Sequence, residues 1–314
     1  MLRHFTLICL LIVPLLLVAN SSYAFEEEEV KKEQKSESDN TEKDKKETPT
    51  TGSPKKKQRS DITIIAPIVT FSQQKEDLNH YLPKNIIKPI LAGPDDYTTL
   101  VETSTTPNNK GVIILLPEWQ QNAVNPKAIN FLRKALPDKG WTTISVQAPN
   151  MPANYPSHAL KLSERTEENI KILTPYKEKL QTLMTAVMKQ AKNYPGIFLV
   201  ITQGSHAAIL IDIYEEKPDI KPTALVMLSS FMLTDIANER FAKNIALSEL
   251  PVLDLYLKKD HPLVKSSAQL RKKYTNKEMK TSFRQKQLQN FNSGYYPKET
   301  LLREINGWLK TIGW

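Results

Sequence analysis

The sequence contains a single cysteine, Cys9, which lies inside an apolar run near the amino terminus. If that run is a signal peptide that is removed, the rest of the chain has no thiol. This excludes disulfide bonds, thiolate metal ligands and a cysteine nucleophile, so the hydrophobic core alone must stabilise the fold. Because Ile8 precedes Cys9 where a lipoprotein signal needs a small residue, we do not expect lipid attachment there.

Glycine and histidine are also scarce, with nine glycines and five histidines in 314 residues. The sequence has no Gly-x-Gly-x-x-Gly pattern, which argues against a phosphate-binding loop for a nucleotide cofactor. It also has no His-x-x-x-His pattern and no cluster of histidine with carboxylate residues, so nothing suggests a metal site. We therefore predict neither a cofactor nor a metal ion.

The amino-terminal segment is typical of a secretory signal peptide. Arg3 precedes an apolar run over residues 5–18, which is short for a membrane span. The small residues Ser22 and Ala24 follow at the positions that a signal peptidase reads. We expect residues 1–24 to be removed, which leaves no integral membrane span in the mature chain and places it in the periplasm or outside the cell. The alternative is an uncleaved membrane anchor.

Residues 25–60 consist mainly of Glu, Lys, Ser, Thr and Asp, with almost nothing apolar. Such a segment cannot bury enough surface to offset the entropy lost on ordering, so we expect a disordered charged linker. The remaining residues, 61–314, have the length of one large α/β domain, with its core over 97–314.

The positive charge belongs to the expected folded domain, because acidic and basic residues cancel within the linker; the whole chain has a formal net charge of +9. A basic surface favours anionic partners, and for an exported chain these are envelope components such as lipid headgroups, lipopolysaccharide or cell-wall polymers, or an envelope protein. The alternative is a surface that is merely soluble. We do not expect nucleic acid as a partner.

Strand patterns alternate with helical patterns along residues 97–314, which predicts an α/β fold with a mainly parallel central sheet and helices on both faces. The turn over 106–111 predicts a hairpin between the first two strands, and Pro175 predicts a break in a long helix. The expected strands are 97–103, 112–116, 141–148, 198–202, 224–228, 251–257 and 282–288. The expected helices are 126–136, 166–191, 207–214, 231–247, 266–274 and 298–312.

A strand, a sharp turn and a helix follow one another over residues 196–214. Small residues surround the turn, as they do where a tight elbow exposes a serine nucleophile between a strand and a helix. If Thr202 ends the strand, however, the apex of the turn is Gly204, which has no side chain. Ser205, the candidate nucleophile, then lies one position late.

Three segments carry a resemblance to a known family: GVIILLPEW at 111–119, GWTTISVQAP at 140–149 and REINGWL at 303–309. With the order of elements over 97–314, they resemble the α/β-hydrolase fold. More narrowly, they resemble an uncharacterised family of exported bacterial α/β-hydrolase-like proteins, catalogued as a domain of unknown function. This resemblance implies a fold, and it brings no established substrate.

A hydrolase of this fold needs a nucleophile, an acid and a histidine in that chain order. The segment PVLDLYLKKD ends in Asp260, which resembles the acid, but the only later histidine is its neighbour His261. A serine hydroxyl without an imidazole base is a poor nucleophile. His206 and His158 are the alternative bases.

Two hypotheses follow. The first is an exported α/β-hydrolase-like protein that is non-catalytic and acts as a binding or cell-envelope component. The second is a serine hydrolase of esterase, lipase or amidase type, with Ser205 as nucleophile, Asp260 as acid and a relocated histidine, His261 first.

Overall fold

The computed structural model describes residues 70–119 and 121–314, which belong to one compact unit. The signal peptide expected at 1–24 and the linker expected at 25–60 lie outside the described residues.

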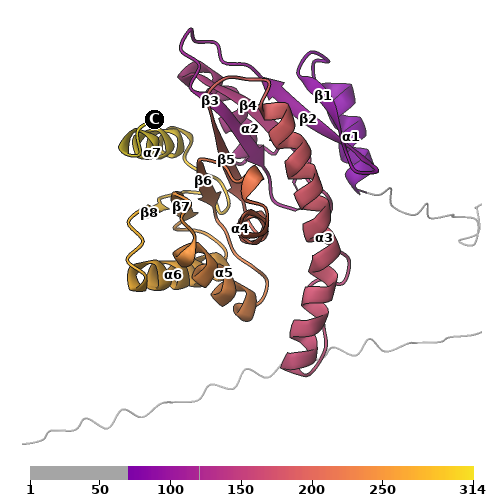
Figure 1. Cartoon of the computed structure of the whole chain (residues 1–314), viewed down its shortest axis with the longest axis vertical. Coiled ribbons are helices and arrows are strands. Elements are labelled where there is room, and N and C mark those ends of the chain that lie inside the picture. The colour runs from indigo at the N-terminus through magenta and orange to yellow at the C-terminus, as the bar shows by residue number, and fades with distance from the viewer. Residues whose placement is uncertain (1–69, 120) are drawn as a thin grey trace, which may run out of the picture. The chain divides into compact units, whose positions relative to one another are not determined.

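An eight-stranded sheet forms the centre of this unit, with the strand order β1-β2-β4-β3-β5-β6-β7-β8 (Figure 1). β2 is antiparallel to both of its neighbours, and the six strands from β4 to β8 are parallel. The predicted α/β fold with a mainly parallel sheet is therefore confirmed. The strands are β1 (Ile87–Ala92), β2 (Asp95–Glu102), β3 (Gly111–Leu116), β4 (Trp141–Val146), β5 (Ile197–Gln203), β6 (Ala224–Leu228), β7 (Val252–Leu257) and β8 (Phe283–Leu288).

Helices cover both faces of the sheet, as Figure 1 shows for α3 and α7 on opposite sides. One core lies between the sheet and α3 (Leu162–Ala191), α4 (His206–Glu216) and α5 (Asp235–Leu247). A second core lies between the other face and α2 (Ile129–Ala135) and α7 (Lys298–Thr311). The remaining helices are α1 (Thr70–Tyr81), which packs Leu78 near Leu100 of β2, and α6 (Pro262–Lys277).

The central strands β3 and β4 are buried at every position, which explains why β3 is a continuous apolar run. β4 carries polar residues that bond to neighbouring segments. The hydroxyl of Thr143 donates to the carbonyl of Arg133 at 3.1 Å, and the hydroxyl of Ser145 donates to the carbonyl of Ala123 at 2.8 Å. These bonds satisfy buried hydroxyls and fix the connection that follows β3.

The predicted hairpin between residues 97–103 and 112–116 is wrong. β2 pairs with β1 and β4, and β3 lies beyond β4. The hairpin joins β1 to β2 through Gly93, which has a φ of +64°. β1 escaped the sequence analysis because Pro89 interrupts it. Since β1 is an edge strand, the missing N–H of Pro89 removes no necessary ladder bond.

The predicted break at Pro175 is also wrong, because α3 is a single helix of 30 residues that contains Pro175. The proline leaves the carbonyl of Lys171 without its helical donor. Both residues are exposed, so water can hydrate that carbonyl, while buried Asn169 and Tyr176 hold the helix on either side.

A buried ion pair fastens α6 to the sheet. The guanidinium of Arg271 donates to both carboxylate oxygens of Asp254 on β7, at 2.8 and 3.0 Å, and both side chains are 0% exposed. Nη1 of Arg271 donates to the carbonyl of Ser230 and the hydroxyl of Ser267. These four bonds compensate much of the cost of burying two charges.

Candidate functional site

The turn between β5 and α4 has the backbone of a nucleophile elbow. β5 ends at Gln203, Gly204 has a φ of +65°, and α4 begins at His206. The N–H of Gly204 donates to the carbonyl of Leu228 at the end of β6, at 3.0 Å. The expected apex at Gly204 is confirmed, and the left-handed backbone there favours glycine.

The carboxylate of Glu118 fills the space beside this apex. Glu118 lies in the loop after β3, and a β-carbon added to Gly204 would lie 0.9 Å from its Oε2. The backbone N–H of Ser205 donates to Oε1 and Oε2 at 3.3 and 3.2 Å, and the N–H of Trp119 donates to Oε1 at 3.2 Å. Glu118 therefore occupies the volume that a nucleophilic side chain at the apex would need.

Those two N–H groups have a known counterpart in the α/β-hydrolase fold. There, an oxyanion hole is made by the N–H of the residue after the nucleophile and by an N–H from the loop after the third strand. Ser205 and Trp119 hold these two positions here. The carboxylate of Glu118 thus lies where such an enzyme would stabilise a developing oxyanion.

Burial raises the pKa of the Glu118 carboxyl from 4.5 to about 7, while the N–H groups of Trp119 and Ser205 and the charge of Lys127 oppose this rise. The residue keeps a little exposed surface, but Trp119 and Ser205 on either side of the carboxyl are buried. Near neutral pH the group therefore exists in both protonation states, and ionisation carries a cost in desolvation.

The hydroxyl of Ser205 is directed away from the apex. The residue is 2% exposed, and its Oγ donates to the carbonyl of Phe231 in the connection between β6 and α5, at 2.8 Å. No histidine among the described residues bonds to this oxygen. A carbonyl cannot accept a proton in catalysis, so the hydroxyl has no base in this arrangement.

His206 is a buried residue of the core. It is 0% exposed, and its Nδ1 lies 2.6 Å from the carbonyl of Pro117. Because a carbonyl only accepts, Nδ1 carries the proton, and Nε2 accepts from the hydroxyl of Tyr176 at 2.5 Å. Burial lowers the pKa of His206 to about 4, so the ring is neutral. Both nitrogens are occupied, and the ring is stacked on Tyr176 and lies edge-on to Trp119.

Asp260 lies after β7, where the resemblance places the acid. Its Oδ2 accepts from the hydroxyl of Ser229 at 2.5 Å and from the N–H of Leu257 at 3.0 Å. The same hydroxyl lies 2.6 Å from that of Tyr296, which follows β8. Ser229 has a φ of +48°, a conformation that is uncommon for a residue with a side chain. In a hydrolase of this fold, the acid accepts a hydrogen bond from the catalytic histidine. Here Asp260 accepts from the hydroxyl of Ser229, and the hydroxyl of Tyr296 lies next to that of Ser229.

The two remaining histidines do not complete a triad. His261 caps α6, where its Nδ1 accepts from the N–H of Leu263 at 3.3 Å, and its ring stacks on Phe231 at 5.5 Å. Its backbone N–H, not its ring, bonds to Asp260, at 2.9 Å. His158 is exposed, and its ring makes no hydrogen bond to another described residue.

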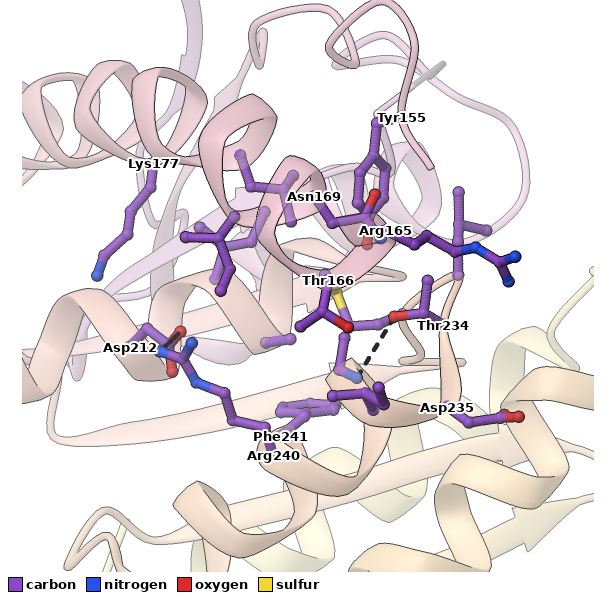
Figure 2. A pocket seen from close by; sticks show the side chains of 18 of the residues that line it. Tyr155, Arg165, Thr166, Asn169, Lys177, Asp212, Thr234, Asp235, Arg240 and Phe241 are labelled. Carbon is purple, nitrogen blue, oxygen red and sulfur yellow. Dashed lines mark hydrogen bonds and ion pairs between the residues drawn. The ribbon is translucent and has the colours of Figure 1, made fainter. Parts of the chain in front are cut away.

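A groove of about 650 Å³ lies between α3, α4 and α5 (Figure 2). Figure 2 shows Lys177 and the pair of Arg240 with Asp212 toward one end, and Tyr155 and Arg165 toward the other. Most of the residues that line the groove are apolar. Its apolar lining residues are Leu162, Ile170, Leu173, Ala208, Ile209, Met232, Leu233, Ile236, Ala237, Phe241 and Leu263.

One aromatic contact joins this groove to the elbow. Tyr155 lines the groove and lies edge-on to Trp119, with 5.6 Å between the ring centroids. Trp119 is next to Glu118 in the chain and donates its N–H to that carboxylate. A ligand that contacts Tyr155 in the groove would therefore be connected through Trp119 to the loop that carries Glu118.

Sequence reasoning missed Glu118 and Ser229, as well as the groove. A signal for Glu118 was present, because an acidic residue directly follows a fully apolar strand in the segment GVIILLPEW. Functional side chains often lie at the carboxyl ends of parallel strands, and Glu118 follows such an end. Ser229 likewise follows a buried strand.

Two features are absent from residues 70–119 and 121–314. No group of three or more His, Cys, Asp or Glu residues there has the arrangement of a metal site. Within the same ranges, no helix combines the length and the apolar composition that crossing a bilayer requires.

Solved structures similar to this chain define its fold. Est1E from Butyrivibrio proteoclasticus matches with a TM-score of 0.51 and 12% identity, over 72% of this chain and 98% of that chain. A dienelactone hydrolase from Anabaena variabilis matches with a TM-score of 0.51 and 8% identity, over 72% of this chain and 96% of that chain. At such identities the likeness shows the fold alone, which is α/β-hydrolase-like.

The chain belongs to the family described as protein of unknown function (DUF3530), which it matches over residues 6–311. The resemblance to an uncharacterised α/β-hydrolase-like family is thereby confirmed. No curated protein matches the chain.

Proposed function

We propose that this protein is a non-hydrolytic member of the α/β-hydrolase fold that acts by binding. The observation that carries the proposal is the position of Glu118, whose carboxylate accepts the N–H groups of Ser205 and Trp119 beside a glycine apex. A carboxylate at that position excludes a nucleophilic side chain. It also occupies the donors that would stabilise an oxyanion, which usually make a large contribution to catalysis in this fold.

A fluorophosphonate probe tests this proposal, because it labels an activated serine whatever the natural substrate. We expect no labelling of the purified protein under conditions in which a known serine esterase, added to the same tube, is labelled completely. Stoichiometric labelling that Ser205→Ala abolishes would overturn the proposal. It would support the alternative, a serine hydrolase with Ser205 and Asp260, and substitution of His261, His206 and His158 in turn would then identify the base.

The groove between α3 and α5 is the ligand site that we propose for this binding function. Its volume of about 650 Å³ is in the range of pockets for small molecules. Three apolar residues that line it are exposed: Leu162 at 62%, Ile170 at 53% and Ile236 at 44%. Clustered exposed apolar side chains of this kind favour an apolar ligand that covers them.

A fluorescent long-chain fatty acid is a suitable probe for this groove. We expect saturable binding that Ile170→Asp weakens about tenfold or more, because the ligand would have to desolvate a carboxylate. Leu247→Asp is the matched control, since Leu247 is 71% exposed and lies outside the groove. Equal binding by both variants, or no binding by the parent protein, would contradict the groove as the ligand site without affecting the labelling result.

We also propose that the protein is exported and meets anionic envelope components. The support is the amino-terminal sequence pattern and the net charge of +9. Fractionation of cells should find the protein outside the cytoplasm, and sequencing of its amino terminus should begin at Phe25. A mature chain that retains residues 1–24 would show instead that this segment is an uncleaved membrane anchor.

A further inference from the structure

A second pocket, of about 310 Å³, lies at the opposite end of the sheet from the elbow. It is built at the starts of β3 and β4 and along the last turns of α7. Its lining residues are Lys110, Lys139, Trp141, Asn306, Leu309, Lys310 and Trp314. Since Glu118 follows the far end of β3, this pocket is separate from the elbow and from the proposed groove.

The pocket has an excess of positive charge. Lys110, Lys139 and Lys310 contribute three ammonium groups, and none of them forms an ion pair with another described residue. No Asp or Glu within the described part of the chain lines the pocket. Three like charges around one pocket without an acidic partner repel one another, and a bound anion would relieve that repulsion.

Trp141 forms part of the wall of the pocket and is 1% exposed, because neighbouring residues cover most of its ring. Its indole N–H is buried and has no hydrogen-bond partner among the described residues. The polar character of the pocket therefore comes from its three lysines and Asn306.

The pocket also has aromatic surface, because Trp314 is 40% exposed beside it and Nζ of Lys110 lies 5.9 Å from the ring centroid of Trp141. Backbone bonds hold these parts in place. The N–H of Lys110 donates to the carbonyl of Gly140 at 2.8 Å, and the N–H of Trp314 donates to the carbonyl of Leu309 at 2.9 Å. Charged, polar and flat apolar groups are thus presented together on a fixed backbone.

We propose that this pocket binds a small phosphate-bearing ligand of the class of a phosphorylated sugar. The three lysines match a phosphate dianion as point charges. Trp314 offers an apolar ring face on which the C–H groups of a sugar can pack. The volume suits a ligand of this size, being at the small end of known ligand pockets.

Intrinsic tryptophan fluorescence reports on this pocket directly, because two of the four tryptophans line it. The full chain is titrated in low salt with glucose 6-phosphate, glucose and inorganic phosphate. We expect a saturable change with glucose 6-phosphate, a weaker affinity for inorganic phosphate, and no saturation with glucose. The variant Lys110→Gln/Lys139→Gln/Lys310→Gln should bind glucose 6-phosphate at least about tenfold more weakly, since each lost charged donor weakens binding.

The variant Lys84→Gln/Lys192→Gln/Lys258→Gln is the matched control. These lysines are exposed, lie outside the pocket and change the net charge equally, so binding should be retained. Because all six positions are exposed, both variants should fold, which circular dichroism verifies. An equal loss of binding in both variants, or unchanged binding in the pocket variant, would overturn the proposal.

The three lysines could also bind the phosphate of a lipid headgroup. Sedimentation with vesicles of phosphatidylglycerol and phosphatidylcholine distinguishes a membrane surface from a small soluble phosphate. We expect the pocket variant and its control to sediment equally. Sedimentation lost only in the pocket variant, without saturable binding of glucose 6-phosphate, would show that the pocket contacts an anionic membrane and would overturn a small ligand.

Discussion

The carboxylate of Glu118 lies where a side chain at position 204 would begin: a β-carbon there would lie 0.9 Å from Oε2 of Glu118. The elbow backbone is thus retained without a nucleophile, and a carboxylate from another loop occupies the space. The same carboxylate receives the two backbone N–H groups that an enzyme of this fold would direct at its reacting oxygen.

The first prediction concerns Gly204→Ala. The added methyl group meets the Glu118 carboxylate and a backbone of positive φ, so the free energy of unfolding should fall by about 2–4 kcal/mol. Urea denaturation measures it. Gly307→Ala is the matched control, because a β-carbon there meets nothing within 4 Å in α7, and it should be neutral or stabilise by about 0.5–1 kcal/mol.

A double-mutant cycle assigns the cause of that loss. If the clash with Glu118 is responsible, Glu118→Ala should reduce the cost of Gly204→Ala by about 1–3 kcal/mol, because the two positions share one space. Strict additivity of the two changes would show that backbone strain at Gly204 alone is responsible.

The second prediction concerns pH and Glu118. Between pH 4.5 and about 7 the folded protein binds more protons at this carboxyl than the unfolded chain does, so its contribution to stability falls as pH rises through that window. Glu118→Gln does not titrate. The stability of this variant relative to the parent should therefore rise by up to about 3 kcal/mol from pH 4.5 to 7. Urea denaturation over this range checks it, and a difference independent of pH would contradict it.

The third prediction has the opposite sign and concerns His206. Burial lowers its pKa from 6.5 to about 4, so the unfolded chain binds more protons in that window. The stability that the neutral ring contributes is complete above pH 6.5 and is lost as pH falls toward 4. Relative to His206→Gln, the parent should lose up to about 3 kcal/mol over this range. Thermal unfolding at several pH values measures the trend, and parallel curves for both proteins would refute it.

The fourth prediction concerns the buried pair of Asp254 with Arg271. Asp254→Asn leaves a guanidinium that is 0% exposed without a counter-charge, and the free energy of unfolding should fall by about 3–5 kcal/mol. Glu239→Gln, which breaks the exposed pair with Lys243, is the control and should change stability little. Similar results for both changes would mean that the buried pair does not anchor α6.

Local pattern predicted much of the sheet, because burial leaves a direct trace in the sequence. β3 is a run of apolar residues since both its faces are covered, and Ala224–Leu228 was predicted to the residue as β6 for the same reason. β1 was missed because Pro89 is tolerated only at an edge, and whether a strand lies at an edge is a property of the assembled sheet.

The sequence by itself determined that the apex of the elbow is a glycine and that no histidine follows His261. Tertiary structure alone decided that Glu118 meets this apex, because 87 positions separate it from Ser205 and only the pairing of β3 with β5 brings their ends together. It likewise decided that the hydroxyl of Ser205 bonds to Phe231, and that the three successive helices α3, α4 and α5 enclose a groove. Periodicity and composition report on burial and local backbone, whereas a site depends on which strand ends become neighbours.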